Sequence, residues 1–448
     1  MSVKTGANGL TRRIARFIVE TKMQDIDCTA YEHAKVALLD WLGCALIDVH
    51  NPLVIKLIRY ADREGGNEQA TILGHGIKKT ATQAALINGA ASHVTDYDDT
   101  TTIDIRHASV GLFPSLLACA EWKGSSGTEL LAAYIIGYKV AAVLGSCVGM
   151  SQYHAGLHTT STMGHLASAA GCARLLGLNE QQTVYALGLA GTLSSGLKVV
   201  FGTMTKAFHA GNAAQAGLRA ALLAAEDFTC AEDLLEGTDG YLQAFRGRID
   251  NEAVNSLGRT WDFDHLAQKY HASCHFTHSA IEAVLAIVNN EGVGAEDIAA
   301  IRVQSSQLAL NAAGKENPQT ALEGKFSIPY CLANAILRGD TGLRAFTDEK
   351  VKDAGVKDFK QKISLSVNDD LDPMASRVTV ETRSGMVHER SCDVFREIPG
   401  LEEKRMRIQK KFMDIAEATF GEKRGRPLMD RVLSLETVGD MREFVALI

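Results

Sequence analysis

The first 265 residues repeat the hydrophobic spacing of α-helices. In residues 30–49, apolar side chains recur every three or four positions and so share one face of a helix: Ala34, Ala37, Leu38, Trp41, Leu42, Ala45 and Leu46. Further segments rich in Ala, Leu and Gly follow near residues 79–93, 127–149, 162–176, 179–196 and 211–226. Because small side chains let helices approach closely, this pattern predicts a compact multi-helix domain.

The pattern changes after about residue 265. Four segments alternate apolar and polar residues, as β-strands do: 298–305, 362–367, 377–383 and 386–390. Ser384 and Gly385, between the last two, fit a tight turn, since glycine adopts a positive φ without steric cost. Helical spacing near 279–290 and 329–337 lies among these strands, so the region is predicted to be an α+β domain.

Helical spacing returns from Leu401 onward. The predicted fold class is therefore mainly α with an inserted α+β domain. We expect a large helical-bundle domain over residues 1–265, rejoined by residues 398–448, and a smaller α+β domain over residues 266–397.

Length, composition and charge indicate the number of domains and exclude some classes of binding partner. The 448-residue chain is 46% apolar, which suits two or three domains with ordinary cores. Its formal net charge of −7 argues against binding to a nucleic-acid backbone, because such proteins usually carry a basic surplus. No segment has the unbroken apolar length of about 18 residues that a membrane span needs. We therefore expect neither nucleic acid nor membrane as a partner.

The cysteines and the N-terminal sequence both favour a cytoplasmic protein. Nine cysteines are spread along the chain without a C-x-x-C pair. This is typical of free thiols in a reducing compartment, and it offers no local group of thiolates for an iron–sulfur cluster. Arg12, Arg13 and Arg16 lie near the N-terminus, but the hydrophobic stretch and cleavage motif of a secretory signal do not follow them.

Residues 96–100 hold three carboxylates within four positions, on Asp96, Asp98 and Asp99. Carboxylates so close together can bind a hard cation, keep a neighbouring His or Lys charged, or cap a helix. The alternating acid spacing of a calcium-binding EF-hand loop is absent. The other uses stay open, including a helix cap at Asp98 or Asp99.

Two histidines and two lysines stand near breaks in the helical pattern, where polar side chains can face a cleft. His107 and His158 lie among Ser, Thr and Arg residues, and imidazole is the natural proton carrier near neutral pH. Lys206 and Lys269 have small and apolar neighbours, so each ammonium group can bind a substrate carboxylate or, if desolvated, act as a base. The structural alternatives are a satisfied buried histidine and a surface lysine.

Several common catalytic motifs are absent from the sequence. There is no Gly-x-Gly-x-x-Gly after a strand, no Walker loop, no Gly-x-Ser-x-Gly and no His-Glu-x-x-His. This weakens interpretations as a nucleotide-binding protein, a serine hydrolase or a zinc protease. Two other classes stay open: a non-catalytic helical scaffold, and a metal-dependent hydratase with His93, Asp98, Asp99 and His107 as ligands.

The same polar segments resemble those of the MmgE/PrpD family. Residues 88–100 read N-G-A-A-S-H-V-T-D-Y-D-D-T, which is similar to that family's N-G-x-x-x-H-x-x-D-[FY]-D-D-T segment. Residues 156–164 and 202–214 are similar to its G-x-H-x-T-x-x-x-G and G-x-x-T-K-x-x-H-x-G-x-A-A stretches. Residues 269–278 and 322–327 complete the series, so that the motifs extend in order over nearly the whole chain.

The resemblance implies an enzyme that acts on a small di- or tricarboxylate without a metal ion or an organic cofactor. The family includes 2-methylcitrate dehydratase, cis-aconitate decarboxylase and iminodisuccinate epimerase. It also implies a large helical domain and a smaller α+β lid, usually in a homodimer, with the active site between the two domains. Carried over by position, the catalytic residues are Asp96, His107, His158 and Lys206, and the substrate-binding residues are Thr100, Lys269, Cys274 and His278.

Within the family, the expected reaction is elimination of the 2-methylcitrate dehydratase type. Cys274 stands where the decarboxylase branch is expected to carry a histidine, and residues 269–271 lack the common proline at the third position. These departures count against a decarboxylase and leave dehydratase and epimerase open. Residues 203–206 slightly favour the epimerase of an iminodisuccinate-like dicarboxylate, which is the first alternative. A cis-aconitate-type decarboxylase is the second.

All three reactions build negative charge next to a carboxylate, and fixed cations stabilise such charge. We expect Lys206 and Lys269 to hold the carboxylates of the substrate. His158 or His107 is expected to carry the proton, with Asp96 orienting one imidazole.

Overall fold

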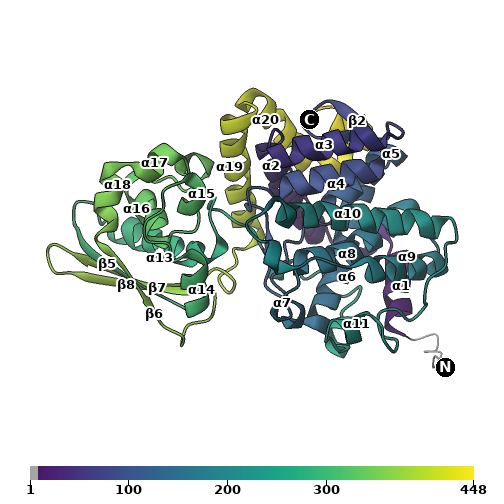
Figure 1. Ribbon diagram of the computed structural model, residues 1–448, viewed down its shortest axis with the longest axis horizontal. Coiled ribbons are helices and arrows are strands. Elements are labelled where there is room, and N and C mark those ends of the chain that lie inside the picture. Colours follow the sequence, from purple (N-terminus) through teal and green to yellow (C-terminus); the bar gives the residue numbers. More distant parts are fainter. Residues whose placement is uncertain (1–8) are drawn as a thin grey trace. The chain divides into compact units, whose positions relative to one another are not determined.

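The computed structural model describes residues 9–448, which form two compact units (Figure 1). Unit 1 comprises the described residues up to Gln268 together with Thr419–Ile448. Unit 2 comprises Lys269–Ala418. Unit 1 is helical and unit 2 is α+β, which confirms the predicted fold class.

The chain returns to unit 1 at Thr419, whereas the sequence pattern set this return at residue 398. Almost all of helix α19 (Leu401–Thr419) is part of unit 2. Two polar contacts hold it there: Arg407 pairs with Glu282, and the Nζ of Lys411 donates a hydrogen bond of 2.9 Å to the carbonyl oxygen of Lys269.

Unit 1 consists of helices with two short antiparallel strand pairs within its described residues. The helices are α1 (Leu10–Glu20), α2 (Cys28–Ile47), α3 (Pro52–Glu64), α4 (Ala81–Ser92), α5 (Phe113–Lys123), α6 (Gly127–Val148), α7 (Ser151–His154), α8 (Thr159–Leu176), α9 (Glu180–Leu193), α10 (Met204–Ala225), α11 (Tyr241–Ala244), α12 (Asn251–Asn255), α20 (Glu422–Leu433) and α21 (Met441–Val445). The strand pairs are β1 (Ala70–Ile72) with β2 (Ile77–Lys79), and β3 (Thr100–Thr101) with β4 (Leu266–Ala267).

The helical segments predicted from hydrophobic spacing are confirmed in unit 1, with one difference at α10. This helix begins at Met204, whereas the pattern placed its start near residue 211. The side-chain oxygen of Thr203 accepts a hydrogen bond of 3.2 Å from the backbone N–H of Thr205, and so caps the helix at this earlier point.

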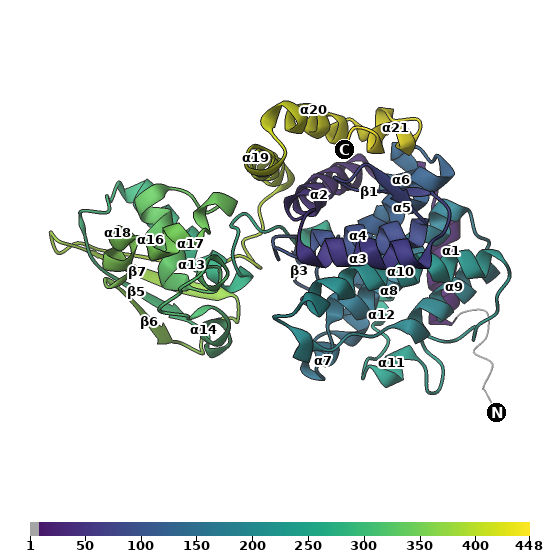
Figure 2. The same cartoon turned by 45° about the horizontal axis from the view of Figure 1, so that its top comes forward.

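Helix α10 packs against α4 and α8 (Figure 2). Two glycines allow the approach of α4 and α10: a Cβ atom on Gly211 would lie 2.0 Å from the carbonyl oxygen of Leu86, and one on Gly89 would lie 2.7 Å from the Cα of Gly211. Any larger side chain at these positions would push the helices apart. The close contact brings the C-terminal end of α4 and the first turns of α10 into one region of unit 1.

Helix α6 is long and apolar enough to cross a membrane, judged by length and composition alone. In the folded chain 94% of its apolar window is buried, as in a core helix. Helices α2 and α3 pass the same test only when taken together, and they are bent by 86° at their junction. These helices are therefore a weak indication of a membrane span.

Unit 2 is built on a four-stranded mixed sheet of order β6-β5-β7-β8. Its strands are β5 (Ile298–Ser305), β6 (Ile363–Val367), β7 (Ala375–Thr382) and β8 (Val387–Asp393), of which only β5 and β6 run parallel. Its helices, besides α19, are α13 (His275–Glu291), α14 (Gln307–Ala313), α15 (Ala321–Gly324), α16 (Ile328–Arg338), α17 (Asp348–Lys352) and α18 (Ala354–Lys360).

The four predicted strands and the predicted hairpin of unit 2 are confirmed. Gly385 has a φ of 84° in the turn between β7 and β8, the left-handed conformation that glycine adopts readily. Helix α13 packs against β7 and β8 and lies beside α16 (Figure 2).

Candidate active site

Polar side chains from three helices and one loop of unit 1 meet at the ends of α4, α8 and α10. His93 is the C-cap residue of α4, and His158 is the N-cap residue of α8. Lys206 and His209 lie near the start of α10. The loop between α4 and α5 carries the acidic segment and His107. Residues far apart in the sequence thus share one site.

The first turn of α8 holds the loop that carries His107. The backbone N–H of His107 donates a hydrogen bond of 3.0 Å to Oγ1 of Thr160, and Oγ1 of Thr159 donates one of 3.3 Å to the carbonyl oxygen of Ile105. Ile105 has a φ of 54° and Asp96 a φ of 56°. A left-handed conformation costs on the order of 1–3 kcal/mol for a β-branched residue, so surrounding contacts must hold Ile105 in place.

Asp98 is the buried centre of the site. Both of its carboxylate oxygens lie 3.0 Å from Nδ1 of His93, and Oδ2 lies 2.7 Å from Nδ1 of His107. Its side chain is 0% exposed. Burial alone would raise the pKa of Asp98, but the attraction of His107 and His93 outweighs it and holds this pKa well below the usual range. Asp98 is therefore a carboxylate between two imidazoles.

Asp96, His107 and Lys206 form the accessible side of the site. Oδ1 of Asp96 lies 2.7 Å from Nζ of Lys206 and 3.5 Å from Nε2 of His107. The side chains of Asp96 and Lys206 are 26% and 21% exposed, whereas those of His93 and Asp98 are fully buried. Among these four side chains, Lys206 and the outer carboxylate of Asp96 are therefore the ones that solvent reaches within unit 1.

His158 and His209 extend the group of imidazoles. The ring of His158 stacks on His93 with centroids 5.9 Å apart, and its Nδ1 lies 3.2 Å from Nδ1 of His209. Burial lowers the pKa of His93 to about 4. Burial, followed by repulsion from His93 when that ring is protonated and from the ammonium group of Lys206, lowers the pKa of His158 well below its usual range. Both rings are neutral near pH 7 and can accept a proton.

Four residues of the site could hold a metal ion. One ligand atom from each of His93, Asp96, Asp98 and His107 lies within 4.8 Å of the others. The set predicted for a metal-dependent hydratase contained Asp99 in place of Asp96. The structure turns Asp99 away, because Asp99 accepts hydrogen bonds from the backbone N–H and the hydroxyl of Ser109. At Asp96 a divalent cation would compete with the ammonium group of Lys206.

The acidic segment does not cap a helix. Residues Thr100 and Thr101 after Asp99 form strand β3, so the interpretation of Asp98 or Asp99 as a helix N-cap is wrong. Thr100 is buried and pairs with Ala267 of β4. Its contact with a substrate stays a prediction.

The other three predicted substrate-binding residues belong to unit 2. Lys269 and His278 are buried, and Cys274 is the half-buried N-cap residue of α13. Nε2 of His278 lies 3.3 Å from the carbonyl oxygen of Ser273, and burial lowers its pKa well below the usual range. His278 is thus a buried histidine of unit 2, and the contacts of all three residues with a substrate stay predictions.

Three residues of the site, His93, Asp98 and His209, were not among the catalytic or substrate-binding residues predicted from the sequence. His93 was considered as a metal ligand, Asp98 as a metal ligand, a helix cap or a partner of a charged His or Lys, and His209 as part of a motif. A local signal existed for each: His93 and Asp98 are five positions apart across the end of a helix, and His209 follows Lys206 by three positions, which places both on one side of α10.

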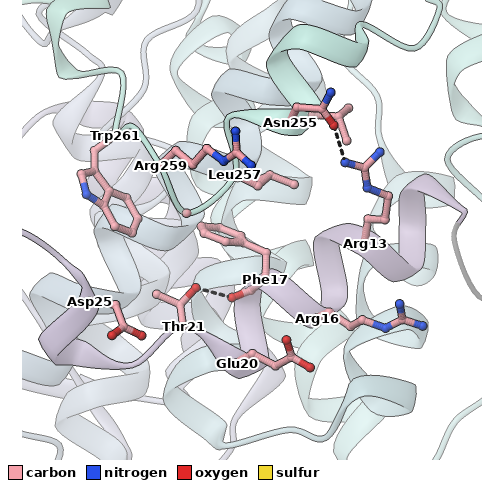
Figure 3. A pocket seen from close by; sticks show the side chains of 12 residues that line it. Arg13, Arg16, Phe17, Glu20, Thr21, Asp25, Asn255, Leu257, Arg259 and Trp261 are labelled. Carbon is pink, nitrogen blue, oxygen red and sulfur yellow. Dashed lines mark hydrogen bonds between the residues drawn. The ribbon is translucent and has the colours of Figure 1, made fainter.

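A separate pocket of 540 Å³ lies between α1 and the segment that follows α12 (Figure 3). Arg13, Arg16 and Arg259 line it together with Phe17 and Trp261. None of the predicted site residues lines this pocket, so it is distinct from the group around Asp98.

Comparison with known proteins adds two matches to protein families and a set of similar sequences. Residues 12–253 match the MmgE/PrpD N-terminal domain, and residues 271–435 match the MmgE/PrpD C-terminal domain. The chain is 26% identical to the cis-aconitate decarboxylase-like protein oryM of Aspergillus oryzae, over 99% of this chain and 98% of that protein. It is 26% identical to a cis-aconitate decarboxylase of Aspergillus terreus, over 98% of this chain and 96% of that protein. It is 25% identical to the cis-aconitate decarboxylase of Mus musculus, over 86% of this chain and 82% of that protein.

Proposed function

The chain belongs to the MmgE/PrpD family, and from that premise we propose that it is a cofactor-independent lyase acting on a small di- or tricarboxylate. One observation carries the proposal: Lys206, Asp96 and His107 form an accessible polar surface, with the carboxylate of Asp98 and neutral imidazoles behind it. This is the composition needed to bind an anion and move a proton beside it.

The accessible side of the site supports binding of a carboxylate. The ammonium group of Lys206 is partly exposed, and Oδ1 of Asp96 lies 2.7 Å from it. Helices α8 and α10 both begin here, and the N-terminal end of a helix dipole favours an anion. A substrate carboxylate can therefore share Lys206 with Asp96.

The imidazoles support proton transfer to or from carbon. His107 lies between two carboxylates, with Oδ2 of Asp98 2.7 Å from Nδ1 and Oδ1 of Asp96 3.5 Å from Nε2, so a ring nitrogen is available on the accessible side. His158 is neutral and buried beside them. We propose that one of the two rings removes a proton from the carbon next to a carboxylate and the other protonates the departing hydroxyl group, while Lys206 stabilises the developing negative charge.

We place dehydration of a 2-methylcitrate-like hydroxytricarboxylate first among the possible reactions. The names of the similar proteins favour a second candidate, decarboxylation of cis-aconitate, in which the same groups protonate carbon as carbon dioxide leaves. Epimerisation of an iminodisuccinate-like dicarboxylate needs only removal and return of one proton, and is the third. A single methyl or hydroxyl group changes binding in an apolar pocket by about 1–3 kcal/mol, so a few side chains decide among them.

The test is a substrate panel in D₂O followed by NMR. Purified full-length protein is incubated with 2-methylcitrate, cis-aconitate and iminodisuccinate. Dehydration yields an unsaturated tricarboxylate, decarboxylation yields carbon dioxide and a dicarboxylate, and epimerisation yields deuterium at the acidic carbon with inversion. The Lys206→Met variant should be strongly impaired, whereas Lys78→Met, which removes a surface lysine paired with Glu121, serves as the matched control. If no member of the panel gives a product or takes up deuterium, the proposed function is wrong.

We further propose that the enzyme works as a homodimer in the cytoplasm. The family resemblance supports the dimer, and nine free cysteines support a reducing compartment. Sedimentation equilibrium of the purified chain measures the oligomeric state. Localisation of a tagged full-length chain in cells measures the compartment.

A further inference from the structure

We propose that Asp98 is a positioning residue shared by two imidazoles, and that it fixes both His93 and His107 in the tautomer that carries its proton on Nδ1. The inference rests on the proposed function, because it assigns a role within the same acid–base site. It concerns the orientation of the two rings rather than the identity of the substrate.

The geometry around Asp98 determines which nitrogen carries the proton. Its oxygens lie 3.0 Å from Nδ1 of His93 and 2.7 Å from Nδ1 of His107, and its side chain is fully buried. A carboxylate has no hydrogen to donate and can only accept. Nδ1 of His93 must therefore carry the hydrogen of its bond to Asp98. Nδ1 of His107 has no hydrogen-bond partner among residues 9–448, but it lies so close to the same carboxylate that a hydrogen on this nitrogen is attracted and a lone pair repelled.

The consequence is that the two neutral rings keep their lone pair on Nε2. In His107 this atom faces the accessible side, 3.5 Å from Oδ1 of Asp96. A lone pair facing a carboxylate is repelled, whereas a proton taken up at Nε2 is attracted by it. Asp98 thus sets the ring as a proton acceptor, and Asp96 stabilises the ring after it has accepted.

His93, on the buried side of the site, also has its hydrogen on Nδ1 and its lone pair on Nε2. Its Nε2 has no hydrogen-bond partner among residues 9–448, and the ring is 1% exposed. A buried acceptor without a partner costs on the order of 1–3 kcal/mol. We infer that the lone pair on Nε2 of His93 accepts a hydrogen bond from a water molecule or a substrate hydroxyl. The opposite tautomer would place the hydrogen on Nε2, and Asp98 would then lose the donor at Nδ1 of His93.

Two neighbours supply internal controls. His158 lies in the same group of rings, but its Nδ1 faces Nδ1 of His209 at 3.2 Å rather than a carboxylate. Asp99 is a buried carboxylate directly after Asp98, but it accepts from the backbone N–H of Ser109 at 3.0 Å. A change at Asp98 should affect the tautomers of His93 and His107, and a change at Asp99 should leave them as they are.

The first experiment reads the tautomers by imidazole ¹⁵N NMR on the full chain without substrate. His93→Asn and His107→Asn assign the two sets of signals. We expect both rings of the wild type as Nδ1–H tautomers, or doubly protonated in the case of His107. In Asp98→Leu, which has a similar volume but no acceptor oxygen, nothing holds the hydrogen on Nδ1 of either ring, and at least one ring should change its tautomer. Asp99→Asn should change neither.

The second experiment separates positioning from binding. Asp98 touches imidazoles rather than the accessible side, so Asp98→Asn should lower kcat by roughly 10²–10⁴ with little change in KM. Circular dichroism and thermal unfolding check that the variant folds. Where it does not fold, the wild-type spectrum decides: an Nε2–H tautomer at His93, or a neutral Nε2–H ring at His107, overturns the assignment. An Asp98→Asn variant with unchanged kcat overturns it as well.

The two proposals fail in different ways. The tautomers are measured without substrate, so an inactive panel of carboxylates would overturn the proposed function and leave the role of Asp98 intact. Turnover together with the wrong tautomers would overturn the role of Asp98 and leave the function intact.

Discussion

The Nζ atom of Lys206 lies 2.7 Å from Oδ1 of Asp96, although the two residues are 110 positions apart in the chain. Both side chains are about one quarter exposed, at 21% and 26%. Ion pairs with this exposure contribute little to stability, because water competes for both charges. The pair is therefore well suited to exchange one carboxylate for another, which is what binding of an anionic substrate requires.

Removal of the ammonium group at Lys206 should weaken substrate binding. A hydrogen bond to a charged group contributes about 1.5–3 kcal/mol, so Lys206→Met should raise KM by roughly 10–150-fold. Steady-state kinetics with the active member of the carboxylate panel measures the change. Lys78→Met is the control, since Lys78 is an exposed lysine that pairs with the buried carboxylate of Glu121 and not with the site residues. An unchanged KM with an unchanged kcat would remove Lys206 from the site.

Replacement of His158 should affect turnover more than binding. If this ring transfers the proton, His158→Asn lowers kcat by roughly 10²–10⁴. His165→Asn is the matched control, because His165 is also buried, lies in the helix that His158 caps, and its Nδ1 bonds the carbonyl oxygen of Ser161 at 2.7 Å. Equal loss of activity in both variants would point to a structural role for His158.

Stability should fall as the pH is lowered from about 6.5 to about 4. Burial lowers the pKa of His93 and of His165 to about 4, whereas an imidazole in the unfolded chain titrates near 6.5. Between these values the unfolded chain binds more protons than the native one, so acid favours unfolding. Each such ring contributes up to about 1.4 kcal/mol per pH unit.

Urea unfolding at pH 7 and at pH 5 measures this loss. In His165→Asn the difference between the two pH values should shrink, because one buried imidazole no longer titrates. A variant with the full pH dependence of the wild type would show that the pKa of His165 is the same in the native and the unfolded chain.

Metal removal should leave the activity unchanged. The group of His93, Asp96, Asp98 and His107 offers four ligand atoms, but the ammonium group of Lys206 already neutralises Asp96. Elemental analysis and activity assays before and after dialysis against a chelator provide the measurement. Activity that is lost on chelation and restored by one equivalent of a divalent cation, but not in a His93→Asn variant, would establish the metal-dependent hydratase instead.

The contact between α4 and α10 should tolerate no side chain at Gly211. A Cβ atom there would lie 2.0 Å from the carbonyl oxygen of Leu86, and overpacking of this kind costs about 1–3 kcal/mol or more. Gly211→Ala should lower the urea midpoint and weaken the site, since the helices carry His93 and Lys206. Gly439→Ala, where a Cβ meets nothing within 4 Å, is the control and should unfold like the wild type.

Local patterns were enough to predict the elements of this chain. The helices of unit 1 and the strands of unit 2 follow from hydrophobic periods of 3.6 and 2, and the β7–β8 turn follows from Gly385. These features depend on neighbours in the sequence, so the sequence carries them directly. The same holds for the candidates His107, His158 and Lys206, which stand out as polar residues at helix boundaries.

The partners within the site were decided by the tertiary structure alone. From the sequence, Asp96 was expected to orient an imidazole and Asp99 to be a possible ligand. The structure places Asp98 beside Nδ1 of both His93 and His107, while Asp99 bonds Ser109; the role of Asp96, which lies 3.5 Å from Nε2 of His107, stays a prediction. In a loop, the direction of each side chain depends on single backbone torsions, such as the φ of 56° at Asp96, and on how closely the supporting helices pack. No periodic pattern encodes either property, so adjacent aspartates with the same chemistry acquire different roles only when the chain folds.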